Sequence, residues 1–211
     1  MNNCRGELCS PATQNVGRDA LGTPPAKTKG RLFVLSGPSG VGKGTVWQEV
    51  LKLVPNIKVS VSATTRKPRS GDVEGVNYFF KSPEEFAEMI ERGELLEWAV
   101  YNGNHYGTPI WAVEDMLASG TDVILEIDTQ GALQVKAKMP EAILIFIAPP
   151  SFDALLERLK GRATESDEEI ARRVAAAEAE MAVKGEYDHI VVNDDLQTAV
   201  REVEAIFNPT L

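Results

Sequence analysis

The stretch that decides the fold is Gly37-Pro38-Ser39-Gly40-Val41-Gly42-Lys43-Gly44-Thr45. It follows the apolar run Leu32 to Leu35 and precedes a helix-like segment that starts near Val46. Glycines in such a turn let successive backbone N–H groups point at one anion, and the helix start adds unpaired N–H groups and the positive end of its dipole. Lys43 adds a mobile positive charge for the terminal phosphates of a nucleotide. The pattern also arises by chance in loops, but the flanking strand and helix signals favour a phosphate-binding loop.

This loop departs from the G-x-x-x-x-G-K-[ST] pattern at its last position. Gly44 stands where Ser or Thr binds magnesium in that pattern, and Thr45 comes one residue later. The sequence therefore leaves open whether a protein hydroxyl contacts the metal directly. Mg²⁺ readily keeps several waters and can be held by substrate phosphates and outer-shell carboxylates. We expect Thr45 to contact an inner phosphate of the nucleotide.

Composition limits the classes of partner. The chain has 211 residues, 43% of them hydrophobic, and a formal net charge of −9. Such a charge disfavours a general binder of nucleic acid or of anionic membranes, because both are polyanions. No apolar run approaches the roughly 18 residues of a membrane span. Cys4 and Cys9 could form a disulfide or half of a metal site, but free thiols in a reducing cytosol are favoured, and a cytoplasmic location is expected.

The chain is organised as a tail and one α/β domain. Residues 1–29 show no apolar periodicity and no signal-peptide pattern, and are expected to form a flexible tail. From Gly30 onward strand and helix signals alternate, which predicts a parallel sheet flanked by helices. The expected strands are 31–36, 58–62, 122–128, 142–148 and 189–193. The expected helices are 45–53, 83–91, 109–118, 152–160, 167–181 and 196–207, the one at 167–181 being an ordinary solvated helix.

A different pattern fills the stretch from Thr64 to Tyr106, where short aromatic runs predict a small antiparallel subdomain inserted into the parallel core. Its first part places three cations, Arg66, Lys67 and Arg69, within four positions of an otherwise acidic chain. Two arginines three residues apart on a turning loop can converge on one phosphate. A solvated basic loop is the alternative. The preceding nucleotide-binding motif and the tyrosines Tyr78 and Tyr106 favour a phosphate site.

These residues resemble the guanylate kinase family over about Gly30 to Phe207. Besides Gly37 to Thr45, the resemblance rests on Thr64 to Phe80, Leu96-Glu97-Trp98-Ala99, Gly103 to Thr108, Ile124 to Asp128 and Val191 to Asp194. It implies a core of residues 30–62 and 109–211, a GMP-binding insert at about 63–108 and a short helical lid at about 158–175. It also implies transfer of the γ-phosphoryl group of ATP to GMP, and to dGMP, in purine nucleotide metabolism and GMP recycling, with Mg²⁺ as cofactor.

The resemblance assigns roles on the acceptor side. Glu97 would accept both the N1–H and the exocyclic amino donors of guanine, which suits guanine and disfavours adenine. Ser62 and Thr108 would reach the base, and Asp128 would contact the amino group from the carboxyl end of a strand, where ligands of open α/β sheets bind. The acceptor phosphate would be held by Arg66, Arg69, Tyr78 and Tyr106, and Asp72 belongs to the same substrate-binding set.

On the donor side, Lys43, Arg162 and Arg173 match the residues that neutralise the transferred group, with Arg158 as a further candidate. Surface arginines paired with nearby glutamates are the alternative, above all for Arg173. Glu126 matches a position, usually Asp, that belongs to the magnesium shell, and the longer side chain makes an indirect contact the expectation.

Two other functional classes stay open. One is a non-catalytic guanylate-kinase-like module that binds a phosphorylated protein segment in the acceptor cleft; the presence of Lys43 and Arg162 argues against it. The other is a P-loop kinase for a different nucleoside monophosphate, against which Ser62, Glu97 and Asp128 argue. A homo-oligomer is compatible with the sequence.

Overall fold

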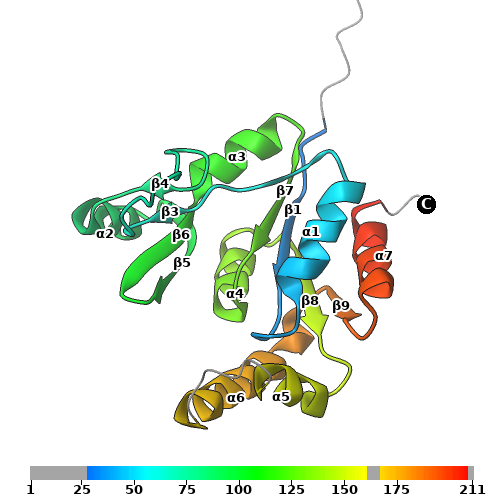
Figure 1. Ribbon diagram of the computed structural model, residues 1–211. Helices are drawn as coiled ribbons and strands as arrows, with labels where there is room; N and C mark the ends of the chain where they lie inside the picture. Colours follow the sequence, from blue (N-terminus) through cyan, green and yellow to red (C-terminus); the bar gives the residue numbers. More distant parts are fainter. Residues whose placement is uncertain (1–27, 161–166, 209–211) are drawn as a thin grey trace, which may run out of the picture.

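The larger of two sheets is entirely parallel and places the phosphate-binding loop at its carboxyl edge. The structure, a computed structural model, describes residues 28–160 and 167–208. The strands are β1 (Leu32–Ser36), β2 (Ile57–Val59), β7 (Asp122–Glu126), β8 (Ile143–Ala148) and β9 (His189–Val192), in the order β2-β7-β1-β8-β9. β1 is central, so the loop that follows it emerges between β7 and β8 (Figure 1).

Helices cover both faces of this sheet. α1 (Lys43–Leu53) and α7 (Leu196–Phe207) pack on one face, where Phe33 and Phe207 meet edge to face with their ring centroids 4.3 Å apart. α3 (Ile110–Ala118) and α4 (Thr129–Lys138) pack on the other. Buried strands with helices on both sides explain the nearly continuous apolar runs in β1 and β8.

The second sheet forms a separate layer with its own small core. Its strands are β3 (Ala63–Thr64), β4 (Phe79–Phe80), β5 (Leu95–Tyr101) and β6 (Asn104–Pro109), in the order β4-β3-β6-β5. α2 (Pro83–Glu91) packs on it through Phe86 and Met89, and begins with a capping box between Ser82 and Glu85. The expected antiparallel pairing holds for β3–β6 and β5–β6, but β3 and β4 are parallel, so the sheet is mixed.

A third group of helices follows β8. α5 (Phe152–Lys160) and α6 (Asp167–Ala182) pack against each other below the sheet in Figure 1, and the short 3-10 helix η1 (Lys184–Glu186) leads into β9. α6 is not simply solvated, because its Ala177 is fully buried in the core. Among the described residues, none of the helices is both long enough and apolar enough to cross a membrane.

The elements that the sequence pattern missed include α4 and β6. α4 was not predicted because its buried residues, Thr129, Gly131, Ala132 and Val135, are small or weakly apolar and produce no clear helical stripe. β6 was missed because Gly107 and Pro109 interrupt it. β2 ends at Val59, earlier than the predicted strand 58–62, because the chain leaves the large sheet there and enters the second one at Ala63.

Candidate active site

The phosphate-binding loop has the predicted strand–turn–helix geometry. α1 begins at Lys43, and Gly42 before it has φ 94°, a left-handed conformation that glycine adopts without steric cost. Lys43 Nζ donates to the carbonyl oxygens of Gly37 at 2.6 Å and Pro38 at 3.3 Å. Burial lowers the pKa of the Lys43 ammonium, while the carboxylates of Glu180, Glu126 and Asp128 raise it. The cation therefore lies folded over the loop, amid negative charge.

Glu126 lies where the missing hydroxyl of the loop would point. A Cβ atom built on Gly44 would lie 3.7 Å from Glu126 Oε1. The parallel register places Glu126 beside Leu35, two residues before the loop begins. The Glu126 carboxylate thus lies near the position where a Ser or Thr side chain would begin, and the described residues contain no cluster of three or more metal-ligating side chains.

The other side of the loop is held by the α5–β9 region. Arg158 donates from Nη1 to the Val41 carbonyl at 3.3 Å and from Nη2 to the Asn193 carbonyl at 3.1 Å. Asn193 Nδ2 also donates to the Val41 carbonyl at 2.8 Å. A cavity of about 280 Å³ opens here, lined by Gly40, Val41, Gly42, Thr45, Arg158, Asn193, Asp194 and Leu196. Arg158 therefore binds the backbone of the loop, and Asn193 is a contact that sequence reasoning had not singled out.

The lid is only partly described. Arg173 Nη2 lies 3.5 Å from Ser39 Oγ, which brings one predicted lid arginine to the phosphate loop. Arg162 lies outside the described residues. Glu180, on the helix predicted to be solvated, accepts a hydrogen bond from the backbone N–H of Ser39 at 3.1 Å. The sequence signal for Glu180 is its helical spacing: it lies one turn after the buried Ala177 and two turns after Arg173, so the three residues share one side of the helix.

The basic loop Arg66 to Asp72 belongs to the second, smaller unit, formed by the second sheet and α2, and is held by hydrogen bonds within the loop itself. Arg66 Nη2 donates to Asp72 Oδ2 at 2.9 Å, and the Arg66 guanidinium carbon lies 5.2 Å from the ring centroid of Tyr78. The backbone N–H of Arg69 bonds the same Asp72 oxygen at 2.8 Å, and this bond, ahead of those from Arg66, lowers the pKa of Asp72. Asp72 thus positions the two arginines and does not itself point to an anion.

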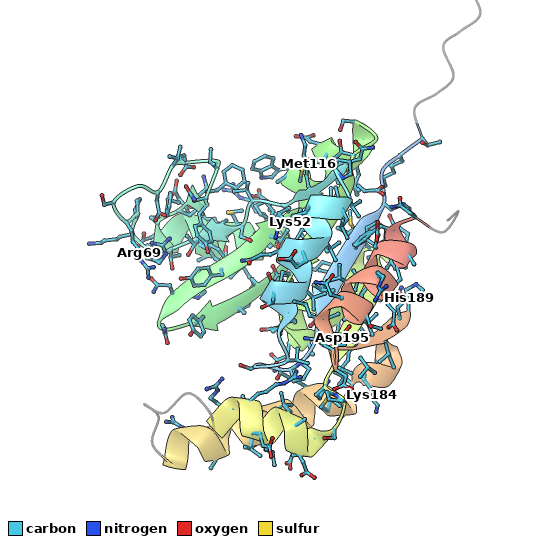
Figure 2. All side chains as sticks on the ribbon, turned by 45° about the vertical axis from the view of Figure 1, so that its right-hand side comes forward. Lys52, Arg69, Met116, Lys184, His189 and Asp195 are labelled. Atoms are coloured by element: carbon cyan, nitrogen blue, oxygen red, sulfur yellow. The ribbon has the colours of Figure 1, made fainter. Side chains whose placement is uncertain are left out.

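Of the four residues predicted to bind the acceptor phosphate, Arg66, Tyr78 and Tyr106 lie close together. The rings of Tyr78 and Tyr106 lie edge to face with centroids 6.0 Å apart, and Tyr78 touches Arg66. The Arg69 side chain is exposed, makes no hydrogen bond within the described residues and projects from the loop of the smaller unit (Figure 2). The Arg69 guanidinium, whose positive charge also lowers the pKa of Asp72, is exposed and accessible to an anionic ligand.

The predicted base-reading residues are also brought together. Thr108 Oγ1 donates to Glu97 Oε1 at 2.6 Å, a bond between β6 and β5 in the buried interior of the site. Ser62, Tyr78, Thr108 and Glu126 line one cavity of about 220 Å³. Ser60, which sequence reasoning did not select, lines it too, and its buried hydroxyl has no hydrogen-bond partner among the described residues. Glu126 is therefore close to both the phosphate loop and the second unit.

Burial of the Glu97 carboxyl group is energetically unfavourable. Glu97 is 6% exposed, and burial raises the pKa of its carboxyl group. The hydrogen bond from Thr108 and the charge of Lys138 lower that pKa, and the negative charge of Asp128 raises it further. Asp128 caps α4, where its Oδ1 accepts from the Gly131 N–H at 2.7 Å. Two acidic groups are thus held close to each other with few charges to neutralise them, as expected if a ligand supplies donors.

A larger cavity of about 790 Å³ lies between the second unit and the α6 region. It is lined by residues of β5, α4 and α6, among them Trp98, Asp128, Leu133, Ala176 and Glu180. Asp128 also acts on the nearby Glu97 carboxyl group, and Glu180 also bonds Ser39 of the phosphate loop. The larger cavity thus has carboxylates of Asp128 and Glu180 in its wall, and the smaller one has that of Glu126.

Comparisons with known proteins agree with this geometry. The sequence model of the family described as guanylate kinase matches residues 29–210. The chain is 53% identical over 177 residues to a guanylate kinase of Desulfitobacterium hafniense, covering 84% of this chain and 88% of that protein. It is 54% identical over 180 residues to a guanylate kinase of Halalkalibacterium halodurans, covering 85% and 88%. A crystal structure of guanylate kinase from Anaplasma phagocytophilum superposes with a TM-score of 0.65 at 34% identity and covers 87% of each chain.

Proposed function

The chain belongs to the guanylate kinase family and uses ATP to phosphorylate GMP to GDP, and we propose that the two sites described above divide this reaction between them. The loop Gly37 to Thr45 binds the ATP phosphates, and the second unit binds GMP. The observation that carries this division is the cavity shared by Ser62, Tyr78, Thr108 and Glu126, because it joins the acceptor residues to a carboxylate beside the phosphate loop.

On the donor side, charge neutralisation is the main task. Phosphoryl transfer needs in-line positioning and stabilisation of charge on the phosphate oxygens, with no covalent bond to the protein. Lys43 is already at the loop and exchanges its bonds to the Gly37 and Pro38 carbonyls for phosphate oxygens. Arg173 reaches the same loop through Ser39, and Arg162 is assigned to the lid on the family resemblance.

Magnesium fits this site through Glu126. Mg²⁺ takes oxygen ligands, keeps several waters and is commonly bound by one or two carboxylates together with substrate phosphates. Glu126 is the carboxylate nearest to Gly44, and no hydroxyl occupies that position of the loop. When bound, the ion would neutralise charge on the phosphates, with Glu126 holding it directly or through one of its waters.

On the acceptor side, phosphate and base are read by different groups. Arg66, Arg69, Tyr78 and Tyr106 hold the phosphate of GMP, with Asp72 keeping the two arginines in place. Glu97, fixed by Thr108, accepts the N1–H and amino donors of guanine, with Asp128 as the second acceptor for the amino group and Ser62 reaching the base. These contacts are to base and phosphate only, so dGMP is expected to be an acceptor too.

A coupled assay of ADP formation with GMP, dGMP, AMP, UMP and CMP tests this function. Turnover with GMP and dGMP, and at least about a hundredfold less with the other three, is the expected result, since buried acceptors left unpaired discriminate strongly. Preference for another monophosphate would assign the chain to a different P-loop kinase. Binding of GMP without ADP formation would favour a non-catalytic module.

A further inference from the structure

The strand that carries Glu97, β5, is hydrogen-bonded by side chains of α4, a helix that packs on the parallel sheet. β5 is an edge strand of the second sheet, with β6 as its one strand partner. Gln134 of α4 bonds the backbone of β5 twice: its Oε1 accepts from the Trp98 N–H at 3.2 Å, and its Nε2 donates to the Trp98 carbonyl at 3.4 Å. Lys138, one turn further along α4, donates to the Leu95 carbonyl at 2.6 Å. A helix side chain thus bonds both backbone groups of an edge-strand residue.

These hydrogen bonds hold the backbone of β5 on either side of Glu97. Leu95 lies two residues before it and Trp98 one residue after it, so the backbone is held on both sides of the carboxylate. Gly131 lies on the same face of α4, three and seven positions before Gln134 and Lys138. A Cβ atom on Gly131 would lie 3.2 Å from Glu97 Oε2, so a glycine here lets the carboxylate approach the helix.

The same helix also fixes the second carboxylate. Asp128 is the N-cap of α4, bonded to the Gly131 N–H at 2.7 Å. Both acidic groups are therefore held in place by α4. Asp128 is held by its cap interaction, and Glu97 is held through the bonds from Gln134 and Lys138 to its strand. Guanine presents neighbouring donors at fixed separation, so selective binding requires acceptors whose positions are set to a fraction of an ångström.

We propose that Gln134 is a positioning residue for base recognition, which sets Glu97 against Asp128 by clamping β5 to α4. This inference rests on the proposed function, because it assigns both carboxylates to guanine. Gln134 lines the large cavity, and its amide is engaged by the backbone of Trp98. Its two hydrogen bonds hold the edge strand at Trp98, which lies next to Glu97, pairs with Gly107 of β6 and has no strand on its other side in the described sheet.

Gln134→Met tests the clamp because it keeps the length of the side chain and removes both hydrogen-bonding groups. Gln197→Met makes the same change at an exposed position of α7, on the opposite face of the sheet, and serves as the control. We would measure kcat and KM for GMP, for ATP and for IMP, which has the N1–H of guanine but lacks its amino group. Gln134→Met should lower kcat/KM for GMP about three- to tenfold, the size expected for about one net hydrogen bond because the effect reaches the base indirectly, and leave KM for ATP within about twofold.

The ratio of kcat/KM for GMP to that for IMP is the decisive readout. We expect Gln134→Met to lower it, while Gln197→Met leaves it unchanged. A loss of activity that is proportional for GMP and IMP, with an equal rise in KM for ATP, would show that Gln134 is merely structural and would overturn the proposal. So would a Gln134→Met enzyme indistinguishable from wild type.

A double-mutant cycle with Glu97→Gln separates this inference from the proposed function. If Gln134 acts through Glu97, Gln134→Met should change the GMP-to-IMP ratio much less in the Glu97→Gln background than in the wild type. Full additivity would overturn the clamp while leaving the role of Glu97 intact. No effect of Glu97→Gln alone would instead remove the guanine assignment, and the inference with it.

Discussion

The backbone N–H of Ser39 donates a hydrogen bond at 3.1 Å to the carboxylate of Glu180, so an acidic side chain of α6 occupies the phosphate-binding loop of the ligand-free chain. Glu180 also acts on Lys43, whose pKa its negative charge raises. The N–H group of Ser39 and the Lys43 ammonium, which we propose bind the ATP phosphates, thus both interact with an internal anion. ATP must displace this carboxylate from Ser39 before its phosphates can use the same donor.

Glu180→Gln should therefore tighten ATP binding. The amide keeps the size of the side chain but removes the negative charge that competes with phosphate, and we expect a dissociation constant about two- to fivefold lower. Calorimetry with a non-hydrolysable ATP analogue measures it, with Glu178→Gln, exposed on the same helix, as the control. Burial raises the pKa of Glu180, so the competitor is lost as pH falls through that pKa, and wild type should approach the variant on the acid side. Weaker binding by Glu180→Gln would show that the carboxylate assists ATP.

Lys43→Ala should abolish turnover and leave the fold intact. Among the described residues Lys43 bonds two loop carbonyls, and we expect its main partner to be the nucleotide, so kcat should fall about a hundredfold or more. Lys52→Ala, on the exposed face of the same helix (Figure 2), is the control. Initial rates and thermal melting are the measurements. Near-normal turnover in a folded Lys43→Ala protein would contradict the assignment of the ATP site.

Arg66→Lys should impair GMP binding selectively. Lysine keeps the charge but loses the planar group that reaches Asp72 at 2.9 Å and lies over Tyr78 at 5.2 Å. We expect KM for GMP to rise about tenfold and KM for ATP to change little, because an arginine fork at a phosphate site is not replaced by an ammonium. Steady-state kinetics on Arg66→Lys and on Arg92→Lys, an exposed pair partner of Glu88, provide the comparison. Equal effects on both substrates would argue against a GMP phosphate site.

Glu97→Gln should weaken the choice of base. The amide keeps the Oε1 acceptor for Thr108 but turns a donor toward the donors of guanine. The mismatch in a closed site should cost about 1–3 kcal/mol in kcat/KM for GMP. Discrimination against AMP should narrow, because the charge that disfavours the N1 acceptor of adenine is gone. The ratio of kcat/KM for GMP and AMP at saturating ATP decides this; an unchanged ratio would mean that Glu97 does not read the base.

The same variant should be more stable than wild type at neutral pH without nucleotide. Burial raises the pKa of Glu97 in the folded chain, so the stability present below the ordinary glutamate pKa is lost as pH rises through the raised folded value. Glutamine stays neutral and loses nothing over this range. Melting temperatures measured from about pH 4 to pH 7 should diverge in favour of Glu97→Gln as pH increases. A variant that melts lower than wild type at pH 7 would show that the Glu97 charge is compensated in the folded chain.

Local sequence patterns predicted the parts of this protein that contiguous residues encode. The loop Gly37 to Thr45 carries its own glycines and follows an apolar run, so its strand–turn–helix context could be read directly, and the structure confirms it. The helices Pro83–Glu91 and Leu196–Phe207 have the predicted bounds, since each has a capping residue and a clear apolar stripe. Family resemblance supplied the pairing of the arginine loop with Glu97, which no local pattern contains.

Tertiary structure alone decided how these parts act on one another. α4 lacks an apolar stripe because it packs through small residues, so neither the helix nor the clamp of Gln134 on Trp98, 36 residues away in sequence, could be read from a periodic pattern. The contact of Glu180 with Ser39 spans 141 residues and depends on how α6 packs near the phosphate loop. The sequence by itself determined the phosphate loop, the parallel α/β core and the chemistry of the candidate side chains, because each is encoded within a few neighbouring residues. Which carboxylate is buried against Thr108, which braces the arginines and which bonds the phosphate loop was decided only when packing brought distant segments together.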